Sequence, residues 1–237
     1  GYSDLRWHEA CTRATGRASP HYLPADIFYA LAMPALNPRD RTAILAAQCG
    51  DTRVIRHLVN RGYGAALKTG FRHSQGQVLA FLDADGTYPP DALPGMYQAM
   101  AAQDADIIVG SRMSGAASEM PVTRRVGNFA FAQMLSILSG VRVQDSASGM
   151  RMFKRQALKK LYPLPDGLNF TPAMTTRALN EELKIVEVPI SYAERIGRSK
   201  LSVVRDGVRF TNTIVWTTMT YRPVRVWGGI GLGMGAV

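Results

Sequence analysis

Largely apolar runs of strand length most constrain how this chain folds. They recur at residues 27–37, 52–59, 77–82, 105–112 and 183–190. A strand that is buried on both faces reads as a continuous apolar run, whereas a half-buried strand alternates between apolar and polar residues. Segments with helical spacing separate several of these runs. We therefore expect an α/β fold with a mostly parallel sheet and helices on both of its faces.

Four segments have the apolar spacing of helices, namely residues 62–73, a segment that starts near Asp91, residues 129–138 and residues 202–221. In the first, Tyr63, Leu67 and Phe71 are four residues apart and share one face. In the second, Asp91 is suited to cap the helix, and apolar residues follow at i, i+3, i+4 and i+7 from Leu93. No internal repeat or linker is evident, which favours one α/β domain.

One apolar run leads directly into two aspartates. Val78 to Leu82 is followed by Asp83 and Asp85. Ligands of open α/β sheets bind outside the carboxyl ends of the strands, and neighbouring carboxylates repel unless a cation or water lies between them. Mg²⁺ takes oxygen ligands and commonly bridges carboxylates to substrate phosphates. Taken alone, the pair fits a metal site and a solvated turn equally well.

The positive charge of the chain is concentrated in its second part. The net charge is +10, of which residues 101–237 carry +8. The segment from Arg195 to Arg225 has seven basic residues and a single acid, Asp206. Such a block indicates phosphate groups, nucleic acid or an anionic membrane surface. Few of its aromatic residues suit base stacking, and the acidic strand end would repel a nucleic-acid backbone, so we expect no nucleic-acid partner.

The ends of the chain bear on its location. The first residues lack the pattern of a signal peptide. The two cysteines, Cys11 and Cys49, suggest neither a disulfide framework nor a metal site, so we expect reduced thiols that face the cytoplasm. No run of about 20 apolar residues spans a bilayer. Residues 226–237 are uncharged, and fit either the start of a membrane segment or a Gly-rich tail.

Six ordered motifs carry a family resemblance: NRGYGAALKTG, FLDADGTYPPD, VGSR, RRVGN, DSASGMRMF and ERIGRSKLS. Over about residues 60–227 the chain resembles a family-2 glycosyltransferase of the GT-A fold. The resemblance is to the branch that includes dolichyl-phosphate mannose synthases and bacterial polyprenyl-phosphate glycosyltransferases. It implies a GT-A domain at residues 26–210, followed at residues 211–237 by a juxtamembrane helix and the start of a membrane segment. Residues 1–25 stay unassigned.

The resemblance implies a donor site. Asp83 would help to hold the nucleotide, and Asp85 would have a catalytic role by binding a Mg²⁺ or Mn²⁺ ion on the diphosphate, with both aspartates as metal ligands. Pro34 and Asn37 match the nucleotide-binding end of the family's first strand. Thr87 stands where related synthases often have a glutamine as a further metal contact, and threonine is a shorter oxygen donor.

Basic residues of the motifs match phosphate sites of the family. Arg112 resembles a donor-phosphate residue, whereas Arg124, Arg195 and Lys200 resemble residues of the acceptor phosphate. Among these, Arg124 and Arg195 are expected to act in catalysis by offsetting charge on the leaving diphosphate. Asp145 matches the general base of many relatives. Because a phosphate acceptor needs no base, Asp145 could equally orient the acceptor or bond to the backbone of residues 146–149.

The chain departs from the family pattern near its N-terminus. The family usually opens with a strand that ends in P-A-x-N-E, followed by a helix and a second strand that ends in D-D-G-S. Residues 34–37 fit the first of these two patterns, but PRDRTAIL follows almost at once and resembles the sequence after the second. The helix, strand and base-binding aspartate between them are missing, and Asp40 is a poor substitute. We therefore expect an incomplete N-terminal part of the sheet, with weak donor affinity and reduced stability.

The resemblance implies an inverting, metal-dependent transfer of one sugar to a polyprenyl phosphate, dolichyl or undecaprenyl. The donor would be a nucleotide sugar of the GDP-mannose or UDP-glucose type, and the reaction would take place at the cytoplasmic face of the membrane. A sugar or protein hydroxyl acceptor is the first alternative, and it would need a base such as Asp145. An inactive nucleotide-sugar binding module is the second, favoured by the N-terminal gap.

Overall fold

The computed structural model describes residues 27–32, 55, 57–83, 87–114, 118–193, 203–221 and 223. Within these ranges the strands form one five-stranded sheet in the order β1-β2-β4-β3-β5. The strands are β1 (Ile27–Ala32), β2 (Val78–Asp83), β3 (Ile107–Ser111), β4 (Arg151–Lys154) and β5 (Ile185–Pro189).

Four of these strands run in one direction and β4 runs against them. β1 is parallel to β2, with Ile27 opposite Val78, and β3 is parallel to β5, with Ile107 opposite Ile185. β4 pairs antiparallel with both β2 and β3. The expected mostly parallel sheet is confirmed. The sequence did not reveal β4, because its four residues are too few to show a period and both of its ends are charged.

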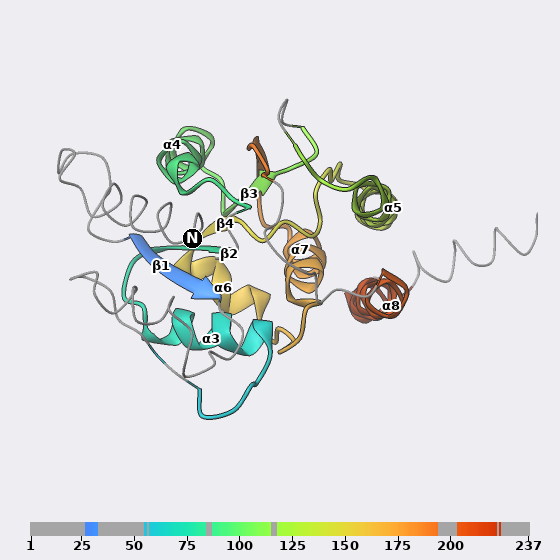
Figure 1. Ribbon diagram of the computed structural model, residues 1–237, viewed down its shortest axis with the longest axis horizontal. Coiled ribbons are helices and arrows are strands. Elements are labelled where there is room, and N and C mark those ends of the chain that lie inside the picture. Colours follow the sequence, from blue (N-terminus) through green and yellow to red (C-terminus); the bar gives the residue numbers. More distant parts are fainter. Residues whose placement is uncertain are drawn as a thin grey trace, which may run out of the picture.

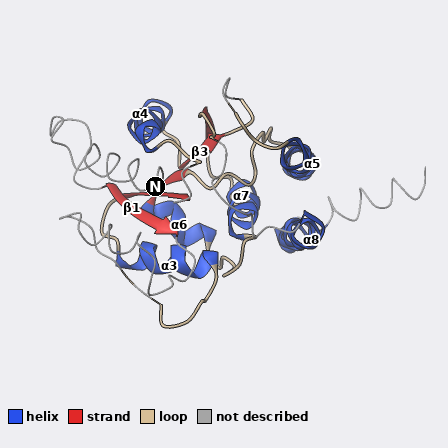
Figure 2. Cartoon of the chain, in the orientation of Figure 1, coloured by secondary structure: helices blue, strands red, loops and turns tan. Residues whose placement is uncertain are grey.

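Helices cover both faces of the sheet (Figure 1), as the sequence predicted. α4 (Leu93–Gln103), preceded by the 3-10 turn η1 (Pro90–Ala92), covers one face. The other face carries α3 (Tyr63–His73), α6 (Arg155–Leu161) and α7 (Phe170–Asn180). α5 (Val122–Ser139) and α8 (Val203–Tyr221) pack against each other at one end, where Figure 2 shows both viewed along their axes.

Alternate residues of the same strands fill two cores. Leu79 and Phe81 of β2 pack among the side chains of α3, α6 and α7. Ala80 and Leu82 point to the opposite face and pack with Met96 of α4. Each large apolar side chain that is fully buried contributes about 1.5–3 kcal/mol. Burial on both faces explains why these strands read as unbroken apolar runs.

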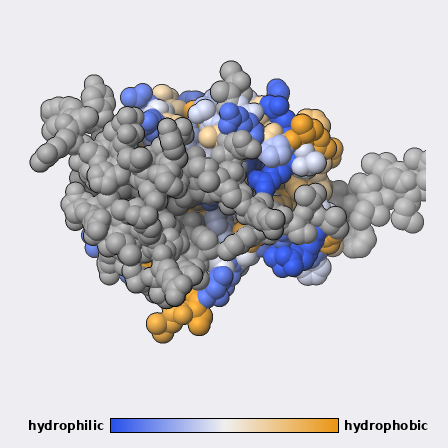
Figure 3. Space-filling view, viewed as in Figure 1, coloured by the Kyte–Doolittle hydropathy of each residue, from blue (hydrophilic) through white to orange (hydrophobic). Residues whose placement is uncertain are grey.

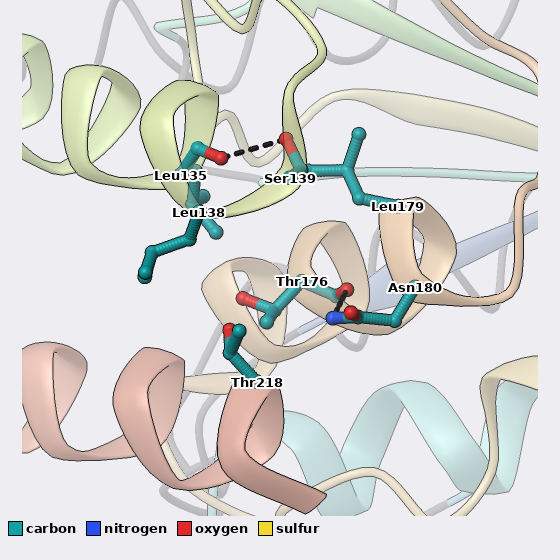
Figure 4. Close-up of a pocket in the computed structure, with 7 residues that line it drawn as sticks. All are labelled: Leu135, Leu138, Ser139, Thr176, Leu179, Asn180 and Thr218. Atoms are coloured by element: carbon teal, nitrogen blue, oxygen red, sulfur yellow. Dashed lines mark hydrogen bonds between the residues drawn. The ribbon is translucent and has the colours of Figure 1, made fainter. Parts of the chain in front are cut away.

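A third apolar cluster joins α5, α7 and α8. It includes Leu135 of α5, Leu179 of α7 and Ile214 of α8, and the rings of Phe131 and Phe210 lie 5.7 Å apart nearby. Figure 4 shows a shallow hollow where the three helices meet, lined by Leu135, Leu138, Ser139, Thr176, Leu179, Asn180 and Thr218. Ser139 and Asn180 bond to carbonyls of their own helices there, so the hollow is a feature of helix packing.

Two local predictions are wrong. Of the strand expected at 52–59, residues 55 and 57–59 have no strand structure, and Leu58 is fully exposed. Charged and polar residues interrupt this run, and His57 bonds to the Thr69 hydroxyl rather than to a strand. The residue that precedes α4 is Ala92 instead of Asp91, because Asp91 lies inside η1.

The other predicted elements are present where the structure describes them. β1 confirms residues 27–32 of the first expected strand, whereas 33–37 and the N-terminal gap lie outside the described ranges. α8 is continuous across residues 210 and 211, so the division of the chain there stays a prediction. No helix in the described part of the chain is long and apolar enough to cross a membrane.

Candidate active site

The direction of the strands brings three predicted site residues to one edge of the sheet. Asp83 is the last residue of β2, and Arg112 directly follows β3, which runs the same way. β4 runs in the opposite direction between them, so the loop that leads into it enters at this same edge. That loop carries Asp145 and Gly149.

Asp83 is held between a tyrosine and a glycine. The Tyr63 hydroxyl donates a hydrogen bond to Asp83 Oδ1 at 2.9 Å. On the other side Gly149 lies so close that an added Cβ would stand about 2.6 Å from Asp83 Cγ. The Gly149 N–H donates to the Tyr88 hydroxyl at 2.7 Å. Any larger residue at position 149 would therefore displace the Asp83 carboxylate.

Arg112 and Asp145 form a buried, bidentate ion pair. Arg112 Nε lies 2.8 Å from Asp145 Oδ2, and Arg112 Nη2 lies 2.7 Å from Asp145 Oδ1. The backbone N–H of Arg112 also donates a hydrogen bond to Asp145 Oδ2. The Asp145 side chain is 0% exposed. Burial acts to raise the pKa of Asp145, but the charge and hydrogen bonds of Arg112 outweigh it, so the pKa lies below its usual value.

This pairing bears on the three roles considered for Asp145. Both of its oxygens accept hydrogen bonds from Arg112, and Oδ1 also accepts the Ala147 N–H at 3.2 Å. A general base needs a lone pair that faces the group it deprotonates. The geometry favours the structural role, in which Asp145 orients Arg112 and the adjacent turn.

Two buried tyrosines connect Arg112 to the turn after the aspartates. The Arg112 guanidinium lies 5.4 Å from the centre of the Tyr192 ring, and the rings of Tyr192 and Tyr88 meet edge to face at 5.3 Å. The next residue, Ala193, donates its N–H to the carbonyl of Thr87, which is buried. Ala193 therefore lies beside Thr87, which stands two residues after Asp85 in the sequence.

Arg151 fixes the loop beneath the site. Its side chain is 1% exposed and donates to the carbonyls of Ser146 and Ser148 and to the Thr175 hydroxyl, at 2.8, 3.0 and 2.8 Å. Burial lowers the pKa of Arg151 to about 10, so it stays charged at neutral pH. Its hydrogen bonds hold in place the loop from which Gly149 approaches Asp83.

The structure thus brings Asp83, Arg112 and Asp145 to the same edge of the sheet. Arg124 lies half-buried in the first turn of α5, and its acceptor role stays a prediction. Five predicted site residues lie outside the described ranges: Pro34, Asn37, Asp85, Arg195 and Lys200. Their roles stay predictions as well.

Sequence reasoning missed the residues that position these charges, namely Tyr63, Tyr88, Gly149, Arg151 and Tyr192. The first four lie in the quoted motifs. Motif order points to the acidic and basic residues, because their charges suit a metal or a phosphate, and it gives the tyrosines and the glycine no comparable role. No local signal marks Arg151 as buried, since its partners are backbone carbonyls set by the fold.

The donor set suits a hard cation. Across the described ranges no group of three or more His, Cys, Asp and Glu residues is placed to hold a metal. The carboxylates of the D-x-D motif would be the ligands that the protein offers, and a diphosphate and water would supply the others. Mg²⁺ and similar ions bind in this way, whereas zinc commonly takes three or four protein ligands, mostly His and Cys.

Comparison with known proteins identifies the family. The family model described as glycosyl transferase family 2 matches residues 37–162. The chain belongs to this family. Residues 37–162 include Asp83, Arg112, Arg124 and Asp145.

Curated relatives of the family extend the match. A dolichyl-phosphate hexose transferase of Haloferax volcanii is 32% identical over 176 residues, which cover 74% of this chain and 75% of the relative. A low-salt glycan biosynthesis hexosyltransferase of the same organism is 34% identical over 173 residues, or 72% of this chain and 41% of the relative. The chain thus spans less than half of the length of that second relative.

Solved structures support the fold. The crystal structure of glucosyl-3-phosphoglycerate synthase from Mycobacterium tuberculosis with Mn²⁺, UDP-glucose and phosphoglyceric acid has a TM-score of 0.60 to this chain. The two are 16% identical, and the match covers 81% of this chain and 68% of that one. The fold is that of the GT-A glycosyltransferases, as the motifs predicted.

Proposed function

We propose that this protein transfers one sugar, with inversion, from a nucleotide sugar to a polyprenyl phosphate, using Mg²⁺ or Mn²⁺. The observation that carries the proposal is the sheet edge where Asp83 lies beside the Arg112–Asp145 pair, in a family-2 chain. The likeness to a dolichyl-phosphate hexose transferase supports a lipid phosphate as the acceptor.

The donor would bind at the strand ends. Asp83 and Asp85 would hold the metal and the nucleotide, and the metal, when bound, acts as a Lewis acid on the diphosphate. Arg112 would add positive charge near the diphosphate, in an orientation that Asp145 and the Tyr192 ring fix. Stabilising the charge that develops on a leaving group is commonly the largest contribution to such catalysis.

The acceptor would attack without a base. An oxygen of the lipid phosphate forms a bond to the anomeric carbon while the bond from that carbon to the diphosphate breaks. The departing nucleoside diphosphate keeps the electron pair, and no proton needs to move because the acceptor is already an anion at neutral pH. The engagement of both Asp145 oxygens supports this choice over a hydroxyl acceptor.

The outer surface of α5 and α8 supports a membrane-bound acceptor. Six apolar side chains on these helices are more than half exposed: Val122, Val126, Phe129, Ile137, Val208 and Trp216. Arg125, Arg205 and Arg209 are exposed beside them. Figure 3 shows hydrophobic residues gathered over α5, next to hydrophilic ones. Apolar residues flanked by arginines are typical of helices that lie in the interface of an anionic membrane, here its cytoplasmic face.

Replacing both Phe129 and Trp216 by serine is expected to weaken binding to vesicles of phosphatidylcholine and phosphatidylglycerol by about tenfold or more. In the wild-type protein both side chains would be transferred from water into the membrane interface. Burial of one such side chain stabilises the bound state by about 1.5–3 kcal/mol. Vesicle co-sedimentation measures the effect. Leu58→Ser, which removes an exposed apolar residue elsewhere, is the control. Equal binding by all variants would refute the membrane surface on α5 and α8.

A screen of radiolabelled nucleotide sugars tests the proposed reaction. Each donor is incubated with vesicles that contain polyprenyl phosphate, with MgCl₂ or MnCl₂ present or with EDTA. We expect one donor to label the lipid, and EDTA to abolish the labelling. Metal-dependent nucleotide binding with neither transfer nor donor hydrolysis would instead identify an inactive binding module.

A further inference from the structure

We propose that Tyr63 is a positioning residue, whose hydroxyl holds the Asp83 carboxylate in the orientation that receives the donor. The inference rests on the proposed function, because it concerns the same donor site. It starts from the hydrogen bond that Tyr63 donates to Asp83 Oδ1 across 2.9 Å. Tyr63 comes from α3, twenty residues before Asp83 in the chain.

Two glycines place Tyr63 at the start of α3. Gly62 has a φ of 99°, a backbone conformation that side chains disfavour, and its N–H donates to Asn60 Oδ1 at 3.0 Å. Gly64 donates its N–H to the Asp166 carbonyl at 2.8 Å, and a Cβ there would come 2.7 Å from Phe170 Cδ2. The helix therefore starts close against the 165–170 segment, and Tyr63 cannot shift without breaking these contacts.

Packing then fixes the direction of the Tyr63 ring. The ring meets Phe170 edge to face, with centroids 6.2 Å apart, and packs against the core that includes Phe71 and Phe81. The ring is thereby held so that its hydroxyl lies within hydrogen-bond distance of Asp83 Oδ1.

The environment of Asp83 shows what this hydrogen bond achieves. Gly149 lies directly against the carboxylate on its other side. With the Tyr63 hydroxyl on Oδ1, the carboxylate is confined before any donor binds. Binding sites that are fixed in advance lose less free energy to ordering when the ligand arrives. Without the hydroxyl, the hydrogen bond that fixes Oδ1 is lost, and donor binding must order the carboxylate further.

Tyr63→Phe tests the proposal because it removes the hydroxyl and keeps the ring. We expect the affinity for GDP or UDP, each titrated calorimetrically with MgCl₂, to fall by about tenfold, in line with a lost hydrogen bond to a charged group. The MgCl₂ concentration that gives half-maximal nucleotide binding should rise as well. Tyr97→Phe, at a partly buried tyrosine of α4, is the matched control and should change neither quantity.

A double-mutant cycle with Asp83→Ala, which removes the group that accepts the Tyr63 hydrogen bond, separates positioning from structure. If Tyr63 acts through Asp83, Tyr63→Phe should change nucleotide affinity less than twofold in the Asp83→Ala background. An equal loss in both backgrounds, or unchanged affinity and metal dependence in the single variant, overturns the proposal, even if the melting temperature falls. A wild-type protein that binds neither nucleotide contradicts the proposed function itself, so the two failures are distinguishable.

Discussion

Replacing Asp83 by asparagine is expected to lower the rate of sugar transfer by about a thousandfold, which is the upper range for removal of one preorganised electrostatic group. The change removes the negative charge at the end of β2 but preserves shape, so an oxygen remains to accept the Tyr63 hydroxyl. The fold should therefore be retained. Measurements of kcat/KM with the donor that the screen identifies, beside a thermal melt, test both parts.

The control for this variant is another aspartate that lies away from the strand ends. Asp104→Asn changes a carboxylate that is 91% exposed and pairs with Lys154. Asparagine also tolerates the left-handed conformation of Asp104, at φ 45°. Transfer by this variant should match the wild type. If Asp83→Asn transfers sugar at the wild-type rate, Asp83 has no part in donor binding.

Asp145→Ala is expected to destabilise the protein by about 3–5 kcal/mol, because it leaves the Arg112 charge buried without its partner. The Arg112 side chain is 11% exposed, so little water can compensate. Denaturant unfolding measures the loss. Asp166→Ala removes a carboxylate that is 57% exposed from its pair with Lys68, and should change the free energy of unfolding little.

Two further measurements distinguish the structural role of Asp145 from a role as base. Replacing Arg112 and Asp145 together by methionine and leucine should restore part of the lost stability, since neither charge is then left alone. The lowered pKa of Asp145 also means that its stabilisation is present above the ordinary aspartate pKa and is lost as the pH falls through the lowered value. A stable Asp145→Ala variant with no activity would favour the base instead.

Much of the fold could be predicted because a strand that is buried on both faces has a continuous run of apolar residues. The runs at 77–82 and 105–112 became β2 and β3, and the spacing of Tyr63, Leu67 and Phe71 became α3. β4 could not be predicted, because its pairing with β2 and β3 depends on contacts far apart in the sequence.

Part of the candidate site could be predicted from the sequence and part could not. The charged residues Asp83, Arg112 and Asp145 could be found from motif order, because their side chains carry the chemistry. Their neighbours could not, because only the folded chain sets Gly149 against Asp83 and the Tyr192 ring beside Arg112. The pairing of Asp145 with Arg112 likewise depends on the antiparallel entry of β4, which no local pattern predicts.

The most direct test of the account compares two acceptors that differ only by a phosphate. Vesicles contain either polyprenyl phosphate or the polyprenol of the same chain length, and both are incubated with the labelled donor and MgCl₂. We predict that the wild-type protein transfers sugar to the phosphate and leaves the alcohol unlabelled, because Arg112 already engages both oxygens of Asp145, the candidate base. Equal transfer to the alcohol would contradict the account.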